Sequence, residues 1–301
     1  MADSKHDFLD PKVLSHLANL PLFARQPMLG NVSGRHRSPI KGSSLEFAQY
    51  RKYVPGDDTR RLDWRAWGRS DRFYIKEFEA DTNLRMCLIV DTSGSMNYQL
   101  GPMSKLDYAR RIAGSLAFLA ARQGDAVGLY CAAEKFQKEI PPRRSGAHLR
   151  VILDELGSVK ADGETGLADA LHEAAERVQQ RALMIVISDL FVETEALRSA
   201  FQHLRFRKHD VAVFHLLEKH EIDFEFERPT RFLDLEGGNA VMADPDIIGP
   251  QYRKAVQKYL SDVTDVVRDA AIDYHRVQVE EPFEAPLARF LLGRTPKQAR
   301  A

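Results

Sequence analysis

The chain has 301 residues, 44% of them hydrophobic, which is enough for one large domain with a substantial core and a smaller module beside it. It carries 43 basic and 43 acidic residues, and this zero formal charge excludes a protein that binds nucleic acid or membranes with its whole surface. Cys87 and Cys131 lie in apolar surroundings typical of core residues, which favours a reducing compartment. Without a secretory leader or a run of about 18 apolar residues, we expect a cytoplasmic protein.

The chain before residue 84 differs in composition from the rest. We predict a helical or variable segment over 1–30 and a basic, aromatic-rich module, mainly β, over 31–83. Residues 35–72 contain ten Lys or Arg and five acids, interleaved with aromatic residues. This composition suits nucleic-acid binding through phosphates and stacking. We favour a structural role, in which the arginines pair with the neighbouring acids and stack on Trp64 and Trp67.

An apolar strand that ends in a carboxylate and two hydroxyls is the most informative feature of the sequence. Residues 86–90 are all apolar, too few for an ordinary helix and typical of a strand buried on both faces. The D-x-S-x-S turn of 91–95 follows and places Asp91, Ser93 and Ser95 on one loop. Ligands of open α/β sheets bind beyond the carboxyl ends of the strands, and Mg²⁺ prefers oxygen ligands. The turn therefore predicts part of a divalent-cation site.

The segments that follow alternate between strand and helix, which predicts a mostly parallel sheet with helices on both faces. Predicted helices span 104–121, 146–156, 167–178, 193–206, 250–270 and 285–292. Predicted strands span 126–133, a shorter segment that ends near 140 before two prolines, 183–189, 210–217 and 273–279. A β-hairpin is expected over 232–242, where Gly-Gly-Asn favours a turn with positive φ. We assign 84–280 to one doubly wound α/β domain and 281–301 to a C-terminal helix and tail.

Two later segments offer the further oxygen ligands that such a site needs. Thr165 lies in the loop before the helix at 167, and Asp189 ends the next apolar strand. Each residue alone has an ordinary explanation, as a turn former or a helix cap. The complete set in this order is better explained by a site for Mg²⁺, with Mn²⁺ or Ca²⁺ as alternatives. The predicted metal residues are Asp91, Ser93, Ser95, Thr165 and Asp189.

These five residues resemble the metal-ion-dependent adhesion site (MIDAS) of von Willebrand factor A domains. The resemblance implies that Ser93, Ser95 and Thr165 ligate Mg²⁺ directly. It also implies that Asp91 and Asp189 support the ion largely through bound water. Glu164 is an additional carboxylate beside this set, able to compete for the ion or tune its affinity.

The upstream segment resembles the signature of a bacterial family, domain of unknown function 58, which precedes a von Willebrand A-like domain. The matching stretches are GRHRSP at 34–39, GSSLEF at 42–47, YRKYVPGDD at 50–58 and RRLDW at 60–64. The end of the chain, 273–276 and 288–294, is also similar to that family, so the resemblance covers nearly everything after about residue 20. Many relatives carry N-terminal membrane spans, and this sequence resembles the short soluble form.

The resemblance implies a binding module and not an enzyme. Such proteins are associated with MoxR-type AAA+ ATPases, and the expected role is adaptor or co-chaperone, with client proteins as further partners. A bound cation would leave one coordination position for a carboxylate of the partner. The cation makes it favourable to bury that acidic side chain, which would otherwise be costly.

Two alternatives stay open at this point. The segment from Asp91 to Ser95 also resembles the D-x-T-G-T loop of P-type ATPases and related phosphatases, in which the aspartate attacks a phosphoryl group. That chemistry needs a lysine near the phosphate and a further acidic cluster, whereas Asp189 is followed by Leu-Phe-Val. The other alternative is nucleic-acid binding by residues 35–72, which predicts a steep dependence on salt.

Overall fold

A computed structural model describes most of the chain as two compact units. The described residues are 6–25, 37–38, 46–52, 63, 68, 73–81, 84–226, 228–238 and 240–295. One unit comprises Met1–Ala24 with Arg85–Ala301, and the other comprises Arg25–Leu84. The smaller unit contains an antiparallel sheet with the strand order β1-β3-β2. Its strands are β1 (Arg37–Ser38), β2 (Glu46–Lys52) and β3 (Tyr74–Asp81).

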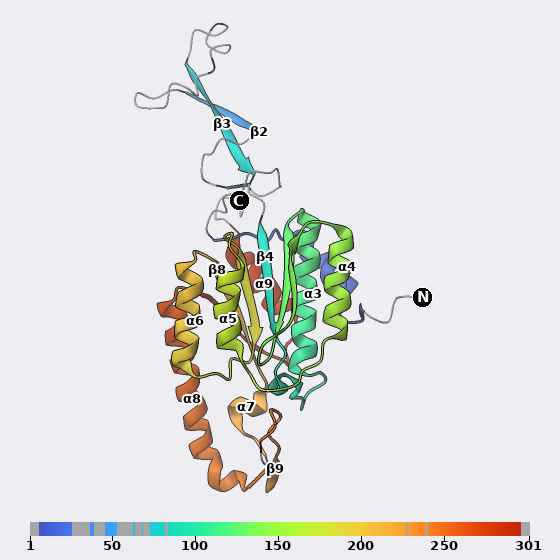
Figure 1. The fold of residues 1–301 in the computed structure, drawn as a ribbon, viewed down its shortest axis with the longest axis vertical. Coiled ribbons are helices and arrows are strands. Elements are labelled where there is room, and N and C mark those ends of the chain that lie inside the picture. Colours follow the sequence, from blue (N-terminus) through green and yellow to red (C-terminus); the bar gives the residue numbers. More distant parts are fainter. Residues whose placement is uncertain are drawn as a thin grey trace. The chain divides into compact units, whose positions relative to one another are not determined.

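A six-stranded sheet with the order β11-β8-β7-β4-β5-β6 forms the centre of the larger unit (Figure 1). Its strands are β4 (Arg85–Asp91), β5 (Ala126–Ala132), β6 (Phe136–Arg143), β7 (Leu183–Ser188), β8 (Asp210–Leu217) and β11 (Asp273–Gln278). All neighbouring pairs are parallel except β5 and β6. Strands β5, β7 and β8 are buried along their whole length, as continuous apolar runs predict. The predicted doubly wound, mostly parallel α/β fold is confirmed.

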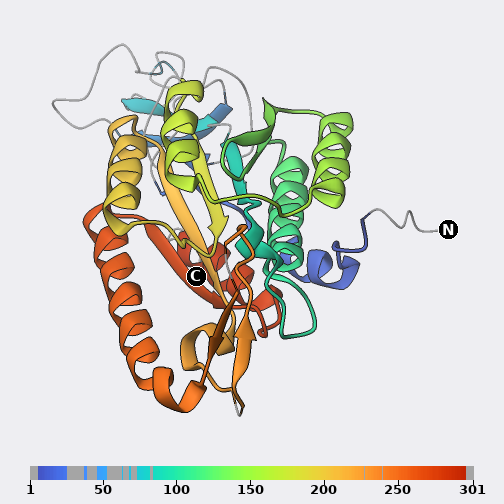
Figure 2. The same cartoon turned by 60° about the horizontal axis from the view of Figure 1, so that its bottom comes forward.

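Helices cover both faces of this sheet (Figure 2). The described helices of the larger unit are α1 (Pro11–Leu17), α3 (Lys105–Gln123), α4 (Gly146–Ser158), α5 (Leu167–Arg177), α6 (Thr194–Phe206), α7 (Lys219–Asp223), α8 (Pro245–Asp269) and α9 (Glu284–Arg294). Apolar residues of α5, α6 and α8 share one core cluster with Ile89, Val186 and Val213 of the sheet. On the opposite face α3 and α9 contact the strands, and α1 and α4 pack against α3. No described helix is long and apolar enough to cross a membrane.

Strand β6 continues through the two prolines that were expected to end it. Pro141 and Pro142 lie within the strand, where its register against β5 shifts by one residue. An edge strand tolerates proline at such a bulge because it has only one neighbour to bond. Gly128 on β5 allows Pro142 of β6 to lie close to β5, since a Cβ at position 128 would stand 2.8 Å from the ring of Pro142.

Helix α8 begins five residues before the predicted start at Pro250. Asp244 caps the helix by accepting a hydrogen bond from the backbone N–H of Asp246, and Pro245 occupies the first turn. This pairing of a capping acid with proline is a stronger start signal than Gly249-Pro250, because glycine has no side chain to accept a hydrogen bond from the first turn. Pro250 therefore lies inside the helix, where it costs one backbone hydrogen bond.

The predicted hairpin forms a small sheet of its own. Strand β9 (Thr230–Phe232) pairs with β10 (Val241–Ala243) antiparallel, and the turn residue Gly237 has a φ of 103°. The strands are shorter than predicted, and residues 233–240 connect them. In Figure 1, α7 and β9 lie beyond the end of the central sheet at which the parallel strands finish. The hairpin therefore stands at the edge of the sheet where the predicted metal residues lie.

Helix α9 is fixed to the opposite edge of the sheet by a buried ion-pair network. The guanidinium of Arg294 donates to Asp210 at 2.8 Å and to Asp273 at 2.8 Å, at the starts of β8 and β11. It also donates to the carbonyl oxygen of Phe23 at 3.2 Å. Because Arg294 is 5% exposed, its loss would leave buried carboxylates without their counter-charge.

We predict that Arg294→Met destabilises the larger unit by about 3–5 kcal/mol, which is the usual cost of breaking a buried ion pair from one side. For a unit of this size the unfolding midpoint should fall by roughly 10 °C in a thermal melt. Arg289→Met is the matched control on the same helix, because Arg289 is half exposed and its pair with Glu281 is worth little. Equal losses of stability in Arg294→Met and Arg289→Met would show that the buried ion-pair network does not hold α9 to the sheet.

Candidate metal centre

The predicted metal residues lie on loops at the carboxyl edge of the central sheet. Asp91 ends β4 and Asp189 directly follows β7. These strands are parallel neighbours, with Val90 paired to Ile187. Because the ends of adjacent parallel strands lie side by side, two acids separated by nearly a hundred residues of sequence meet at one edge.

The D-x-S-x-S turn is closed by hydrogen bonds among its own polar groups. The Oδ1 of Asp91 accepts from the backbone N–H of Ser93 at 2.9 Å and from its hydroxyl at 2.7 Å. The hydroxyls of Ser93 and Ser95 lie 3.1 Å apart. A short 3-10 helix, Gly94–Asn97, continues the chain from this turn. Three oxygen-bearing side chains are thus in contact on one turn, as predicted.

Thr165 reaches the same edge through backbone bonds between two loops. The N–H of Gly94 donates to the carbonyl of Gly163 at 2.8 Å, and the N–H of Asp162 donates to the carbonyl of Thr92 at 2.9 Å. Thr165 follows these contacts and precedes α5. It is partly exposed, whereas the neighbouring Glu164 is exposed. The structure thus places the loop of the fourth predicted ligand against the D-x-S-x-S turn.

Asp189 has a cationic partner that the sequence did not indicate. The Nζ of Lys105, at the start of α3, lies 2.6 Å from Asp189 Oδ2 and 2.7 Å from Glu221 Oε1. The Lys105 side chain is fully buried. Burial alone would lower the pKa of Lys105, but the charges of Asp189 and Glu221 outweigh it and raise this pKa. Asp189 is therefore held by an ammonium group on one side of the site.

The electrostatics of Asp91 fit a cation. Burial and, next, the negative charge of Asp189 raise the pKa of Asp91 to about 6, although hydrogen bonds from Ser188 and Ser93 oppose the shift. The side chain is 1% exposed, and its Oδ2 accepts from the hydroxyl of Ser188 at 2.6 Å. An ionised carboxylate buried beside another is costly unless a positive charge offsets it. Hard oxygen donors with this charge suit Mg²⁺, Mn²⁺ or Ca²⁺.

Sequence reasoning missed four residues of this edge: Ser188, Lys105, Glu221 and Glu236. Ser188 precedes Asp189 at a strand end, where its position could have suggested a role. Lys105 follows the helix cap Ser104, and no local pattern distinguishes it from an exposed lysine. Glu236 lies in the hairpin loop, and its Oε2 accepts from the backbone N–H of Thr165 at 3.3 Å.

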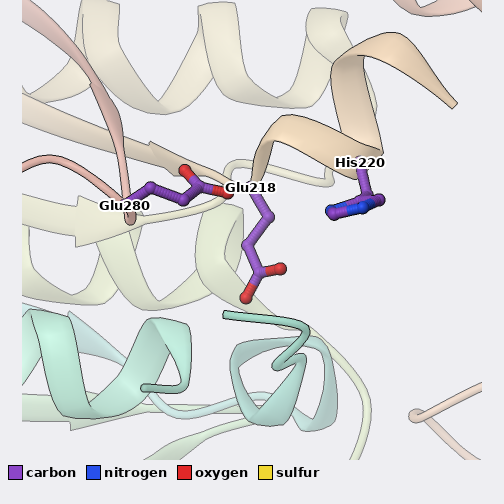
Figure 3. Close-up of side chains that lie close together, drawn as sticks. All are labelled: Glu218, His220 and Glu280. Atoms are coloured by element: carbon purple, nitrogen blue, oxygen red, sulfur yellow. The ribbon is translucent and has the colours of Figure 1, made fainter. Parts of the chain in front are cut away.

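A second group of potential ligands lies at the same end of the larger unit. Figure 3 shows Glu218 and His220 at the start of α7 and Glu280 after β11, with ligand atoms that all lie within 4.8 Å of one another. Both Glu218 carboxylate oxygens accept from the backbone N–H of Leu100, at 3.1 and 3.0 Å. Glu280 accepts from the N–H of Lys219 at 2.8 Å. Since both carboxylates already satisfy backbone donors, we assign this cluster a structural role in holding α7 against the sheet.

The strand order and the parallel pairing define a doubly wound, mostly parallel α/β protein. The chain belongs to the family described as "Protein of unknown function DUF58", whose model matches residues 49–262. It is 24% identical over 293 residues to the "Uncharacterized protein Rv1480" of Mycobacterium tuberculosis. This match covers 96% of this chain and 92% of that protein.

Comparison with solved structures gives matches that include two proteins with low sequence identity and TM-scores below 0.5. BatB from Bacteroides thetaiotaomicron is 18% identical with a TM-score of 0.48, over 73% of this chain and 100% of that one. The SpRpn10 VWA domain is 10% identical with a TM-score of 0.41, over 71% and 96% of the two chains.

We predict that the wild-type protein binds Mn²⁺ and that Ser93→Ala and Asp91→Asn weaken binding by about 10–100-fold, because each removes an oxygen group that holds the ion or its ligands. Isothermal titration calorimetry measures the affinity. Thr92→Val is the matched control, since the Thr92 hydroxyl bonds to Gln137 at 3.3 Å and not to the site. Circular dichroism in chelator should show all three variants folded. Unchanged Mn²⁺ affinity in Ser93→Ala and Asp91→Asn would refute the metal site.

Proposed function

We propose that the chain is a metal-dependent protein-interaction module that acts as an adaptor or co-chaperone of a MoxR-type AAA+ ATPase. The observation that carries the proposal is the meeting of the D-x-S-x-S turn, the Thr165 loop and Asp189 at one sheet edge, where Asp91 is buried beside a second acid. The membership of the chain in its family is compatible with a protein-interaction module, and the ATPase partner is proposed from the family resemblance of the sequence.

The residues of the site suggest how a partner would be held. Ser93, Ser95 and Thr165 would hold the cation, while Asp91 orients the serine hydroxyls through its hydrogen bonds. When bound, the cation supplies a positive centre to which an acidic side chain of the partner can bind. Asp91 and Ser188 would remain beneath the site as a fixed support, because the Asp91 carboxylate is buried and bonded through both oxygens.

Exposed apolar side chains near the site favour a protein partner. Leu100 is 51% exposed, Phe191 is 40% exposed and Leu235 is 43% exposed. Each belongs to a segment that contacts the site: the loop after the D-x-S-x-S turn, the residues after Asp189, and the hairpin loop. Apolar residues around a polar centre are typical of interaction surfaces.

The structure bears on the phosphotransfer alternative in two ways, through Lys105 and through the carboxylate of Asp91. Lys105 provides a lysine near Asp189, but its ammonium group is fully buried and paired with two carboxylates. Asp91 is 1% exposed, and each of its oxygens accepts a hydrogen bond. A nucleophilic carboxylate needs an oxygen free to reach phosphorus. The geometry therefore favours a supporting role for Asp91. The basic segment 35–72 lies largely outside the described residues.

We predict that a pull-down from lysate retains a MoxR-type AAA+ ATPase on the wild-type protein in Mg²⁺ but not in chelator, because the partner's carboxylate needs the cation. Asp91→Ala should lose the ATPase in both buffers, and Thr92→Val should behave as wild type. Mass spectrometry of the eluates provides the readout. Retention of the ATPase in chelator would show that capture does not use the metal.

We also predict that beryllofluoride, which mimics a phosphoryl group on aspartate, does not bind to the Mg²⁺-loaded protein. Fluorine NMR is the measurement. A bound signal that disappears in Asp91→Asn would revive the phosphotransfer alternative.

A further inference from the structure

The loop of the hairpin, whose described residues after β9 are 233–238, lies directly on the D-x-S-x-S turn. A Cβ at position 94 would stand 2.0 Å from the carbonyl oxygen of Leu235 and 2.8 Å from its carbon. No side chain fits there without moving the hairpin backbone. Gly94 thus allows residues of the hairpin to reach the site, although 141 positions separate Leu235 from Gly94 in the sequence.

The next residue, Glu236, enters the site with a defined orientation. Its own N–H donates to Asp234 Oδ1 at 2.8 Å, and the positive φ of Gly237 turns the chain back towards β10. This compact turn directs the side chain at the Thr165 loop, where Glu236 Oε2 accepts from the N–H of Thr165. Glu236 therefore contacts the backbone of a predicted metal ligand.

The second carboxylate oxygen of Glu236 has no hydrogen-bond partner among the described residues. Oε1 is buried, and no residue that the structure describes donates a hydrogen bond to it. Because Thr165 precedes α5, the positive end of that helix accounts for the position of Oε2. The helix end does not explain the position of Oε1. A buried carboxylate oxygen without a hydrogen bond costs free energy, and native structures avoid that cost. A cation held by the adjacent hydroxyls would satisfy this oxygen.

Charge at this edge supports a cation in contact with Glu236. The charge of Asp189 acts on both Asp91 and Glu221, and a fourth carboxylate, that of Glu236, reaches this edge at the Thr165 loop. Lys105 pairs with Asp189 and Glu221. Its ammonium group can offset only one of the four negative charges.

We propose that Glu236 is a ligand of the metal supplied by the chain itself, in the coordination position that the partner's carboxylate takes. The hairpin then occupies the binding position while no partner is bound, and a partner binds by displacing it. This inference rests on the proposed function, because it needs the cation of that site.

The construction of the hairpin suits displacement. Its two three-residue strands pair only with each other and not with the central sheet. Such an isolated ribbon is marginally stable in water. Its base is fixed, since Phe232 packs against Phe224 and Phe226 with ring centroids 5.4 and 5.1 Å away. The loop can therefore leave the site without disrupting the fold of the larger unit.

The test compares wild type with Glu236→Gln, which keeps the size of the side chain and removes its charge. Glu225→Gln is the matched control, because it removes the same charge from an exposed residue before the hairpin whose side chain pairs with Lys219 at 3.2 Å. The probe is Mn²⁺ alone, with affinity measured by calorimetry and with amide hydrogen exchange of residues 230–243 measured by mass spectrometry. Gly94→Ala is a second variant. Its Cβ displaces the hairpin loop from the turn but leaves every oxygen ligand of the site in the sequence.

We expect Mn²⁺ to slow exchange in the hairpin of the wild type and of Glu225→Gln. In Glu236→Gln the affinity for Mn²⁺ should fall about tenfold, as is usual when a group that supports a metal is lost. In this variant and in Gly94→Ala, Mn²⁺ should no longer slow exchange. Equal affinity and equal protection in wild type and Glu236→Gln would overturn this inference and leave the proposed function intact. A wild-type protein that does not bind Mn²⁺ would overturn both.

Discussion

The organisation of this edge depends on one constraint, the burial of the Asp91 carboxylate at the end of a central strand. A carboxylate in that position must be surrounded by donors or by a cation, since its charge is otherwise too costly. The loops around it are arranged accordingly. The turn of 91–95 folds back on Asp91 Oδ1, Ser188 bonds Oδ2 from the neighbouring strand, and the loop of 162–165 is joined to the turn by backbone bonds.

Two acids that arrive at the same edge are stabilised in different ways. Asp189 has an ammonium partner in Lys105, so its charge is largely balanced within the protein. Asp91 has only hydroxyl and amide donors, which stabilise its charge without cancelling it. A cation would therefore be attracted to the side of Asp91, the serines and Thr165. This asymmetry distinguishes Asp91, which orients the hydroxyl of Ser93, from Asp189, which shares Lys105 with Glu221 and so joins α3 to α7.

Local patterns predicted the parts of the molecule that depend on local physics. Continuous apolar runs identified the buried strands, and the D-x-S-x-S spacing identified a turn that groups three oxygens. The partners of Asp189 could not be predicted, because Lys105 is 84 residues away in sequence and its burial depends on packing of α3 and α7. Glu236 was missed for the same reason. The misplaced start of α8 was a local error, since Asp244 and Pro245 already formed the better helix start.

The two prolines of β6 also restrict how other chains can associate with the larger unit. Successive backbone N–H groups of a strand point to opposite sides, so adjacent prolines remove one donor that would face outwards. A strand from another molecule would find an incomplete row of hydrogen-bonding groups along this border, interrupted by a bulge. Edge-to-edge addition and the aggregation that follows from it are thereby disfavoured at β6. Recognition at this border must then use side chains and not a shared backbone ladder.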